Sequence, residues 1–242
     1  MSNPLIHPNI TDAMRTTVAR KAAAVVDLLT AAASEFQPVA FASSMGAEDM
    51  VLTDLIRQYG IAIEIFTLDT GRLPTETYDL MARAEKHYGA RPVTWFPRHE
   101  TVEQYVREQG INAFYDSVEL RKACCAMRKV EPLERALAGK KAWITGMRAQ
   151  QSATRADLPL RELDESRGIV KFNPLSDWTE REVWVYIHTH GVPYNELHER
   201  FYPSIGCQPC TRAISPGEDI RAGRWWWENP ESKECGLHVK AD

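Results

Sequence analysis

The chain has 242 residues, of which 44% are apolar and 26% charged, values typical of a soluble globule that can bury a core. Its 29 Lys and Arg against 33 Asp and Glu give a net charge of −4, which excludes a general basic surface for nucleic acid or an anionic membrane. No apolar run approaches the ~18 to 20 residues of a membrane span. The first residues lack the pattern of a secretion signal, so we expect a cytoplasmic protein.

Apolar patterning predicts alternating helices and strands over the first three quarters of the chain. Helical spacing predicts helices at Asp12–Phe36, Ala47–Tyr59 and Pro74–Tyr88. Short apolar runs bounded by turn residues predict strands, and they lie at Val39–Ala42, Ile61–Leu68, Pro92–Phe96, Ala142–Thr145 and Gly168–Phe172. This alternation predicts an α/β fold with a mostly parallel, doubly wound sheet.

The last quarter of the chain has a different texture. A further helix is expected at Trp178–His190, with Ser176 or Asp177 as its N-cap. Beyond Gly191 the sequence is rich in Pro, Gly, Cys and Trp, without periodicity. We interpret residues 1–242 as a single domain whose segment 211–242 is an irregular, mobile C-terminal tail.

Three loops follow predicted strands, where doubly wound sheets bind their ligands. In the first, Ser43, Ser44 and Gly46 precede a helix N-terminus and form a candidate anion cradle, although an ordinary capped helix start is equally compatible. No Gly-Lys-Ser/Thr follows, which excludes a Walker phosphate loop. Glu48 and Asp49 would repel a phosphate, so this loop either contacts neutral parts of a nucleotide or holds its acids turned away.

The other two loops carry weaker signals. The second has residues suited to contacting a nucleotide through its backbone, and Gly71 permits a close approach; its candidates are Leu68, Asp69, Thr70, Gly71 and Arg72. The third runs from Thr145 to Arg155 and carries Arg148 and Arg155, whose planar guanidinium groups suit phosphate or sulfate. For each loop taken singly, an ordinary turn or a solvated loop is an open alternative.

Four of the five cysteines form two close pairs, the adjacent Cys124 and Cys125 and the CxxC pair Cys207 and Cys210. Without an export signal such pairs indicate a metal site more than disulfides. Adjacent helical side chains point about 100° apart, which suits the separated irons of a [4Fe-4S] cluster better than one tetrahedral ion. A structural zinc, or buried cysteines beside a redox CxxC, stay open. Lys129 lies one helical turn after Cys125.

Cys235 is unpaired and lies near the C-terminus, between Lys233 and His238. A lone cysteine in such surroundings can be a thiolate nucleophile, or a spare thiol on a frayed end. Upstream, Arg221 and Arg224 precede a run of three tryptophans that would dock the segment onto the body.

Together these motifs resemble the assimilatory adenylylsulfate (APS) reductases of the phosphoadenylylsulfate (PAPS) reductase family. The resemblance spans about Phe41 to His238, and the motifs that carry it are SSMGAED, LDTGR, CCAMRK, TGMRAQQSATR, CQPCTR and KECGLH. It implies an adenine nucleotide alpha-hydrolase-like sheet. Met45 departs from the pattern common in this loop of the family, and we expect it to alter the fit around the nucleotide.

The resemblance implies reduction of APS to sulfite and AMP, a step of sulfate assimilation toward cysteine. Cys235 would attack the sulfur, expel AMP and become an S-sulfocysteine, which thioredoxin or glutaredoxin then releases as sulfite. The cysteine pairs would hold one [4Fe-4S] cluster per chain. Substrate contacts would come from the first two loops and from Lys129, Arg155, Arg221, Arg224 and His238. Relatives of this kind form homo-oligomers.

Two alternatives are carried forward. A PAPS reductase, or an enzyme accepting both nucleotides, would share the tail cysteine, although the PAPS branch generally lacks the two cysteine pairs that this chain has. A protein of another class, a zinc-stapled nucleotide-binding protein without catalysis, would leave Cys235 incidental. A ligase of the ATP-pyrophosphatase type would need a glycine- and serine-rich loop that Ser43–Asp49 does not provide.

Overall fold

The computed structural model describes residues 3, 4, 6–151 and 158–229. Within them the helices are α1 (Asp12–Glu35), α2 (Ala47–Gln58), α3 (Thr75–Tyr88), α4 (His99–Gln109), α5 (Val118–Cys125), α6 (Glu131–Leu137) and α7 (Glu180–His190). The strands are β1 (Val39–Ser43), β2 (Glu64–Leu68), β3 (Val93–Trp95), β4 (Ala142–Ile144), β5 (Arg161–Asp164) and β6 (Ile169–Phe172). No helix in these ranges is long and apolar enough to cross a membrane.

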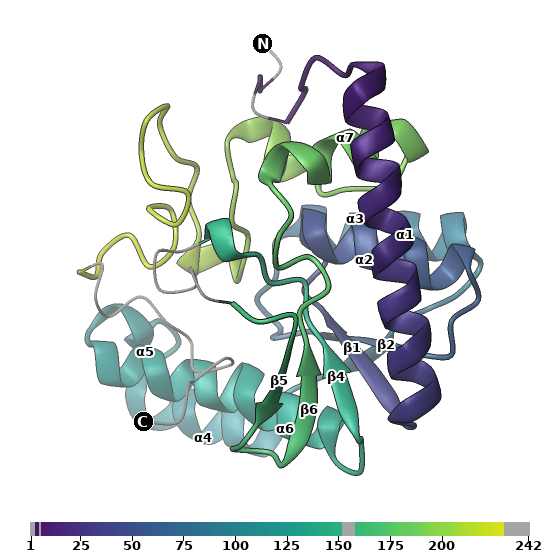
Figure 1. Ribbon diagram of the computed structural model, residues 1–242. Coiled ribbons are helices and arrows are strands. Elements are labelled where there is room, and N and C mark those ends of the chain that lie inside the picture. The colour runs from purple at the N-terminus through teal and green to yellow at the C-terminus, as the bar shows by residue number, and fades with distance from the viewer. Residues whose placement is uncertain (1–2, 5, 152–157, 230–242) are drawn as a thin grey trace.

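The strands form one sheet in the order β3-β2-β1-β4-β6-β5 (Figure 1). Every neighbouring pair is parallel except β5 with β6, which is antiparallel. The order reverses between β1 and β4, so a crevice opens there at the carboxyl ends of the strands. The predicted mostly parallel α/β sheet is confirmed, and the antiparallel edge strand β5 is an addition to it.

Alternation along the strands buries both faces of the sheet. In β1, Val39 and Phe41 join a core shared with α1, α2, α3 and α7, whereas Ala40 packs with Leu133 of α6 and Trp143 of β4 on the other face. In Figure 1, α1 and α6 lie on opposite sides of the strands. Period-2 alternation with apolar residues on both faces explains the continuous apolar runs of the sequence.

The boundaries differ from the predictions in a few places. Pro74 precedes α3 as its N-cap, and Thr179 caps α7 through a capping box with Glu182, in place of Ser176 or Asp177. The predicted strand at Ile61–Leu68 begins only at Glu64.

Between α5 and α6 the helix widens into a π turn at Ala126–Val130, which ends as Pro132 enters the first turn of α6. A proline cannot supply the backbone N–H of a continuous helix, so the wider turn accommodates it.

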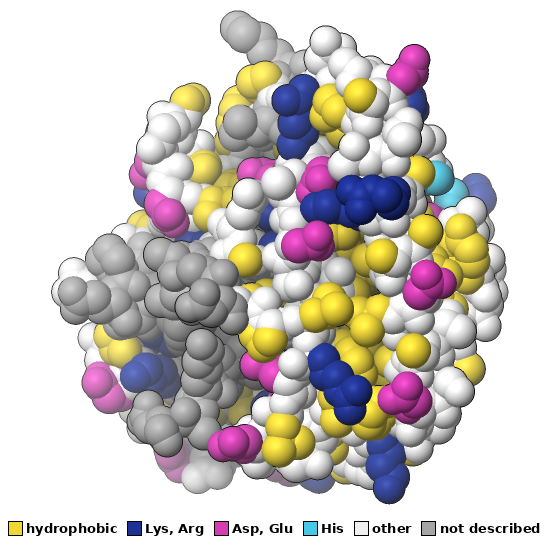
Figure 2. Space-filling view, viewed as in Figure 1, with side chains coloured by type: hydrophobic (Ala, Val, Ile, Leu, Met, Phe, Trp, Pro, Cys, Tyr) yellow, Lys and Arg dark blue, Asp and Glu magenta, His cyan; other side chains and the backbone are white. Residues whose placement is uncertain are grey.

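The segment after α7 is irregular and packs on the body up to Asn229. Two short 3-10 helices (Glu196–Arg200 and Gln208–Cys210) and a bridge between Thr211 and Arg224 organise it. Trp225 is buried, with 1% of its surface exposed. Figure 2 shows Lys and Arg side chains interspersed with Asp and Glu over the visible face. The single-domain assignment for 1–242 and the mobility of 211–242 stay predictions.

Candidate active site

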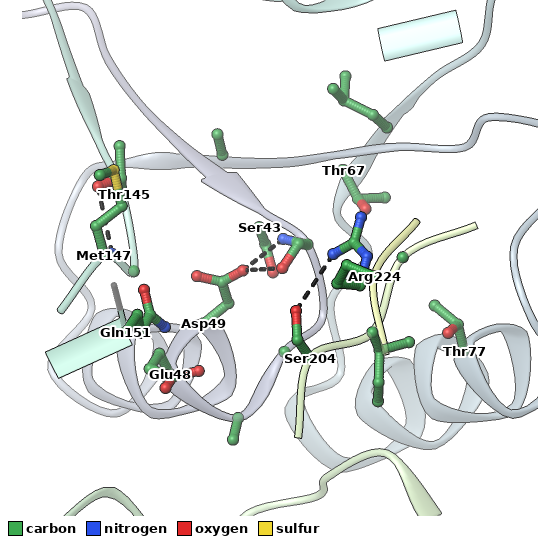
Figure 3. A pocket seen from close by; sticks show the side chains of 18 of the residues that line it. Ser43, Glu48, Asp49, Thr67, Thr77, Thr145, Met147, Gln151, Ser204 and Arg224 are labelled. Atoms are coloured by element: carbon green, nitrogen blue, oxygen red, sulfur yellow. Dashed lines mark hydrogen bonds between the residues drawn. The ribbon is translucent and has the colours of Figure 1, made fainter. Parts of the chain in front are cut away.

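A cavity of about 280 Å³ lies at the carboxyl ends of β1, β2 and β4, where the strand order reverses (Figure 3). The position is the one at which doubly wound sheets bind nucleotides. All three loops singled out in the sequence contribute to its wall. Lining residues of these loops are Ser43, Ser44, Gly46, Glu48, Asp49, Leu68, Thr70, Thr145, Gly146, Met147 and Arg148.

The first loop is shaped by hydrogen bonds within it. The Asp49 carboxylate accepts hydrogen bonds from the Ser44 amide and hydroxyl, both at 2.6 Å (Figure 3). Gly46 is the N-cap of α2 and supplies no side-chain cap. Met45 takes a positive φ of 62°, and its side chain lies in the main core, where its sulfur is 3.7 Å from the Ser43 hydroxyl. Met45 is therefore part of the core beneath the loop and is not among the residues that line the cavity.

Asp49 is a buried carboxylate wedged between two loops. A Cβ at Gly146, in the third loop, would overlap the Asp49 Oδ1 atom, so glycine permits this close approach. Burial raises the pKa of Asp49 from 3.8 to about 7, although the hydrogen bonds from Ser44 oppose the shift. The sequence left two possibilities for this loop: contact with neutral parts of a nucleotide, or acids that turn away from it. The Asp49 carboxylate turns toward the Ser44 amide and hydroxyl of its own loop.

Glu48 forms a different contact, an ion pair of 2.7 Å with Nε of Arg148. The Arg148 side chain is 2% exposed, and both partners of this buried pair line the cavity. Glu180, at the start of α7, lies beside it; burial raises the pKa of Glu180, and the Arg148 charge partly offsets the shift. Burial also lowers the pKa of His198, which lines the same cavity.

Cations lie on the opposite wall. Lys129, Arg221 and Arg224 line the cavity, and their predicted contacts with substrate stay a prediction. In Figure 3, Arg224 and Glu48 lie on opposite sides of Asp49. Arg224 donates a hydrogen bond from Nη1 to the Ser204 hydroxyl at 3.3 Å. Arg224 and Glu48 therefore lie apart in the cavity, and Glu48 and Glu180 have the cation Arg148 beside them.

The second loop divides between two places. Leu68 and Thr70 line the cavity, whereas Asp69, Gly71 and Arg72 are not among its lining residues. The Asp69 carboxylate accepts hydrogen bonds from the Gly71 amide at 2.7 Å and from the Tyr78 hydroxyl at 2.9 Å. These two hydrogen bonds hold the turn that places Thr70 at the cavity wall.

Arg72 points away from the large cavity. It donates hydrogen bonds to the Ile111 carbonyl at 2.6 Å and to Asn112 Oδ1 at 2.9 Å, and its guanidinium lies 5.0 Å from the centroid of the Phe114 ring. These contacts place Arg72 beside the cysteines, on the wall of a second cavity.

The four paired cysteines converge on that second, small cavity of about 20 Å³. Cys124 and Cys125 end α5, and Cys207 and Cys210 flank a 3-10 turn. All four are buried free thiols. Cations on the wall of this second cavity are Arg72, Arg121, Arg128 and Lys129.

Lys129 therefore lines both cavities. The π turn that follows Cys125 places it there, and such turns recur at functional sites. Arg128, the preceding residue, donates a hydrogen bond of 2.6 Å to the Thr70 carbonyl and so fixes the turn against the second loop.

The environments of the CxxC thiols differ. Burial raises the pKa of Cys207, but the Lys129 charge and the hydrogen bond with Thr70, at 3.2 Å, bring it below its ordinary value. Burial and the neighbouring Cys207 raise the pKa of Cys210 to about 12.

The four thiols offer the Cys₄ donor set that iron–sulfur clusters take, within a rim of cations that offsets negative charge. Among the residues that the structure describes, no three His, Cys, Asp or Glu form a group that could hold a metal ion. The residue types, and the convergence of the four thiols on one cavity, fit an iron–sulfur cluster.

Three predicted site residues, Arg155, Cys235 and His238, lie outside the described residues. Conversely, the structure adds residues that the sequence did not indicate. Glu180, His198 and Ser204 line the cavity from α7 and from the irregular segment after it. Local sequence gave no signal for them, because their shared wall is built only by the tertiary fold.

Comparison with known proteins agrees with this geometry. Residues 38–213 match the model of the phosphoadenosine phosphosulfate reductase domain. The chain belongs to this family. It is 58% identical over 222 residues to adenosine 5'-phosphosulfate reductase of Allochromatium vinosum, covering 92% of this chain and 87% of that protein. It is 52% identical to the enzyme of the same name from Neisseria meningitidis (serogroup A), covering 96% and 95%.

Two solved structures share the fold of this chain. A phosphoadenylyl-sulfate reductase from Candida auris, in a phosphate complex, superposes with a TM-score of 0.68 at 29% identity, covering 78% of this chain and 90% of that one. An FMN adenylyltransferase from Candida glabrata superposes with a TM-score of 0.59 at 13% identity, covering 98% and 80%. At 13% identity the second likeness shows a shared fold alone.

The buried Asp49 predicts a pH dependence of stability. Its pKa of about 7 in the folded state exceeds the ordinary 3.8, so the folded protein binds the extra proton between these values. The stabilisation is complete below about pH 4 and is lost as the pH rises through 7. Relative to Asp49→Asn, the native protein should lose on the order of 2 kcal/mol more unfolding free energy between about pH 5 and pH 8. Urea denaturation at both pH values measures this.

The control for this prediction is Asp79→Asn, which changes an exposed aspartate on α3. In this variant the unfolding free energy should change between the two pH values by as much as it does in the native protein. Equal pH dependence in the native protein and in Asp49→Asn would contradict the assignment.

Proposed function

We propose that this protein reduces adenosine 5'-phosphosulfate to sulfite and AMP in sulfate assimilation. The observation that carries the proposal is the nucleotide-sized cavity at the strand reversal, whose lining includes several cations, among them Lys129, which it shares with the site of the four cysteines. The name of the relatives, which cover nearly the whole chain at up to 58% identity, supports the same substrate.

The proposed reaction has two steps. The Cys235 thiolate attacks the sulfate sulfur, a sulfur–sulfur bond forms, and the bond between sulfur and the AMP phosphate oxygen breaks as AMP leaves. A dithiol donor, thioredoxin or glutaredoxin, then attacks the Cys235 sulfur, and sulfite leaves with the bonding electron pair. The second thiol of the donor closes its disulfide and restores Cys235. The donor's two thiols supply the two electrons that the reaction consumes.

The chain's own cations suit the first step. A thiolate approaching a sulfate brings two anions together, so fixed positive charges must offset them. Lys129, Arg221 and Arg224 line the cavity where these charges would meet. We assign Arg155 and His238 to the same group on sequence grounds.

The four cysteines are proposed to hold one [4Fe-4S] cluster per chain. Cys124, Cys125, Cys207 and Cys210 would be its ligands, since they line one cavity as free thiols. When bound, the cluster would supply an electrostatic effect beside Lys129, while the electrons come from the external dithiol. A homo-oligomeric state and a cytoplasmic location stay predictions.

The carboxylates that line the cavity favour APS over PAPS. With the sulfate and phosphate at Arg224 and the other lining cations, the nucleoside would extend toward Glu48, which Figure 3 shows apart from Arg224, and toward Glu180 beside it. Carboxylates accept hydrogen bonds from hydroxyl and amino groups but repel a second phosphate. A dual enzyme would need to balance that phosphate with a further cation, and the one cation packed among these carboxylates, Arg148, already pairs with Glu48.

Replacing the proposed nucleophile tests the reaction directly and separates it from the non-catalytic alternative. Cys235→Ser should abolish sulfite release from APS with thioredoxin, because serine is not deprotonated at neutral pH, while AMP affinity stays within about twofold of native. Sulfite assay and calorimetry measure the two quantities. Cys124→Ser, measured in parallel in the full-length protein, removes a proposed cluster ligand and keeps the nucleophile. The two variants together therefore separate loss of the cluster from loss of the nucleophile. Native turnover in Cys235→Ser would refute the assignment of the nucleophile. AMP binding by native protein that releases no sulfite would instead favour a zinc-stapled binding protein.

Lys129→Ala tests the shared wall. Because the lysine is proposed to offset charge that is greatest in the transition state, turnover should fall on the order of 10- to 100-fold, while AMP binding weakens only a few-fold. Lys122→Ala, an exposed lysine on α5, is the matched control and should match the native protein. Equal losses in turnover and AMP affinity for Lys129→Ala would contradict this role.

Metal analysis of protein purified without oxygen tests the cofactor. We expect about four iron atoms and about four acid-labile sulfides per chain, with a brown colour. Cys125→Ser should lose them, whereas Cys235→Ser should keep them. Zinc without sulfide would instead identify the cysteines as a structural staple.

A further inference from the structure

Arg121 on α5 is buried and forms a two-point ion pair with Glu228. Its side chain has no exposed surface, and it donates from Nε and Nη2 to the two carboxylate oxygens of Glu228, at 2.8 and 2.7 Å. Glu228 itself is 3% exposed. Burying two charges is costly, and only bidentate geometry of this kind offsets much of that cost.

The same arginine stacks on a tryptophan that precedes Glu228 by three residues. The Arg121 guanidinium carbon lies 4.8 Å from the centroid of the Trp225 ring. The Arg224 guanidinium carbon lies 4.7 Å from the centroid of that same ring. Trp225 is also fixed through its backbone, since its amide donates to the Cys210 carbonyl at 3.1 Å. Arg121, Trp225 and Arg224 thus form one stack between the cysteine site and the large cavity.

Arg224 is held mainly by packing. A Cβ at Gly206 would overlap its guanidinium group, so the backbone passes directly against it. Its Nη1 donates to Ser204 at 3.3 Å, and its Nε has no hydrogen-bond partner among the described residues. A guanidinium held by stacking keeps donors for an anion. Its orientation then depends on the ring beneath it.

We propose that Arg121 is a positioning residue for substrate binding: it fixes Trp225 through the Glu228 pair and the stack, and Trp225 in turn holds the Arg224 guanidinium toward the cavity. The inference rests on the proposed function, in which an anionic sulfonucleotide occupies that cavity. Arg121 also interacts with the Cys125 sulfur, so the same side chain ties the anchor to the cysteine site.

A lysine at position 121 could not replace this contact. Lysine keeps the charge but lacks both the planar face that stacks on Trp225 and the fork that binds Glu228 through two parallel hydrogen bonds. Arg121→Lys therefore tests geometry at constant charge.

The chain contains a matched control. Arg135 on α6 also pairs with a glutamate through two hydrogen bonds, to Glu131 at 2.7 and 3.0 Å, and its guanidinium lies 5.2 Å from the centroid of the Trp95 ring. It lines neither cavity. Arg135→Lys makes the same chemical change away from the site.

The experiment measures AMP affinity by calorimetry on the purified holoprotein. Arg121→Lys should raise the Kd for AMP about tenfold, and Arg135→Lys should leave it within twofold. If Arg121 acts through Arg224, the double variant Arg121→Lys/Arg224→Lys should bind AMP no more weakly than Arg224→Lys alone. Additive losses, or native affinity in folded Arg121→Lys, would overturn the proposal.

A second variant covers the case in which Arg121→Lys does not fold. Arg121→Met/Glu228→Leu removes both charges and keeps apolar packing under Trp225, a change that often preserves stability. We expect a thermal midpoint near that of the native protein and weakened AMP binding; native affinity at native stability would overturn the inference. Native protein that binds AMP but releases no sulfite from APS would refute the proposed function and leave the affinity comparison valid.

Discussion

The arrangement of the site depends on one local feature, the π turn at Ala126–Val130. It continues α5 beyond Cys125 and brings Lys129 to the wall that two cavities share. Arg128 locks the turn by its hydrogen bond to the Thr70 carbonyl, and Thr70 in turn contacts Cys207. Through these contacts the nucleotide loop, both cysteine pairs and the cationic wall become one packed unit. A charge placed at the cysteines is thereby felt where the substrate anion binds.

Charge is separated across the cavity by the same fold. The lining cations Lys129, Arg221 and Arg224 come from the π turn and the C-terminal segment, whereas Glu48 and Glu180, with Arg148 beside them, come from the starts of α2 and α7. Glu48 is balanced by Arg148, and Asp49 is satisfied within its own loop. The acids that argued against a phosphate in the first loop are therefore compatible with a nucleotide whose anionic end lies at the other wall.

Much of this architecture was predictable, because its signals are local. Apolar runs of strand length predicted five of the strands, and the positions of the loops after them predicted which residues would meet at one edge of the sheet. The close spacing within each cysteine pair predicted that the four thiols would meet at one site. By contrast, α4 buries no residue fully, since its Val102 and Tyr105 pack only partly against the cysteines, and β5 is a short edge strand of alternating partial exposure. Neither leaves a strong local pattern.

Contacts between residues far apart in the sequence could not be predicted from short motifs. The Glu48–Arg148 pair joins residues 100 positions apart, and Arg121–Glu228 joins residues 107 apart. Arg72 illustrates the same limit: it follows a strand end as expected, but Ile111, Asn112 and Phe114 draw its side chain toward the cysteines. Each depends on tertiary packing that no short motif encodes.

The central claim is that this chain transfers the sulfonate group of APS to its own thiol before any external reductant acts. The most direct measurement is a single-turnover reaction with excess APS and no thioredoxin, followed by quantification of AMP and mass analysis of the C-terminal peptide. The account predicts a burst of one AMP per chain and one added SO₃ group on the peptide that contains Cys235. Continuous AMP release without reductant, or no burst and an unmodified peptide, would contradict it.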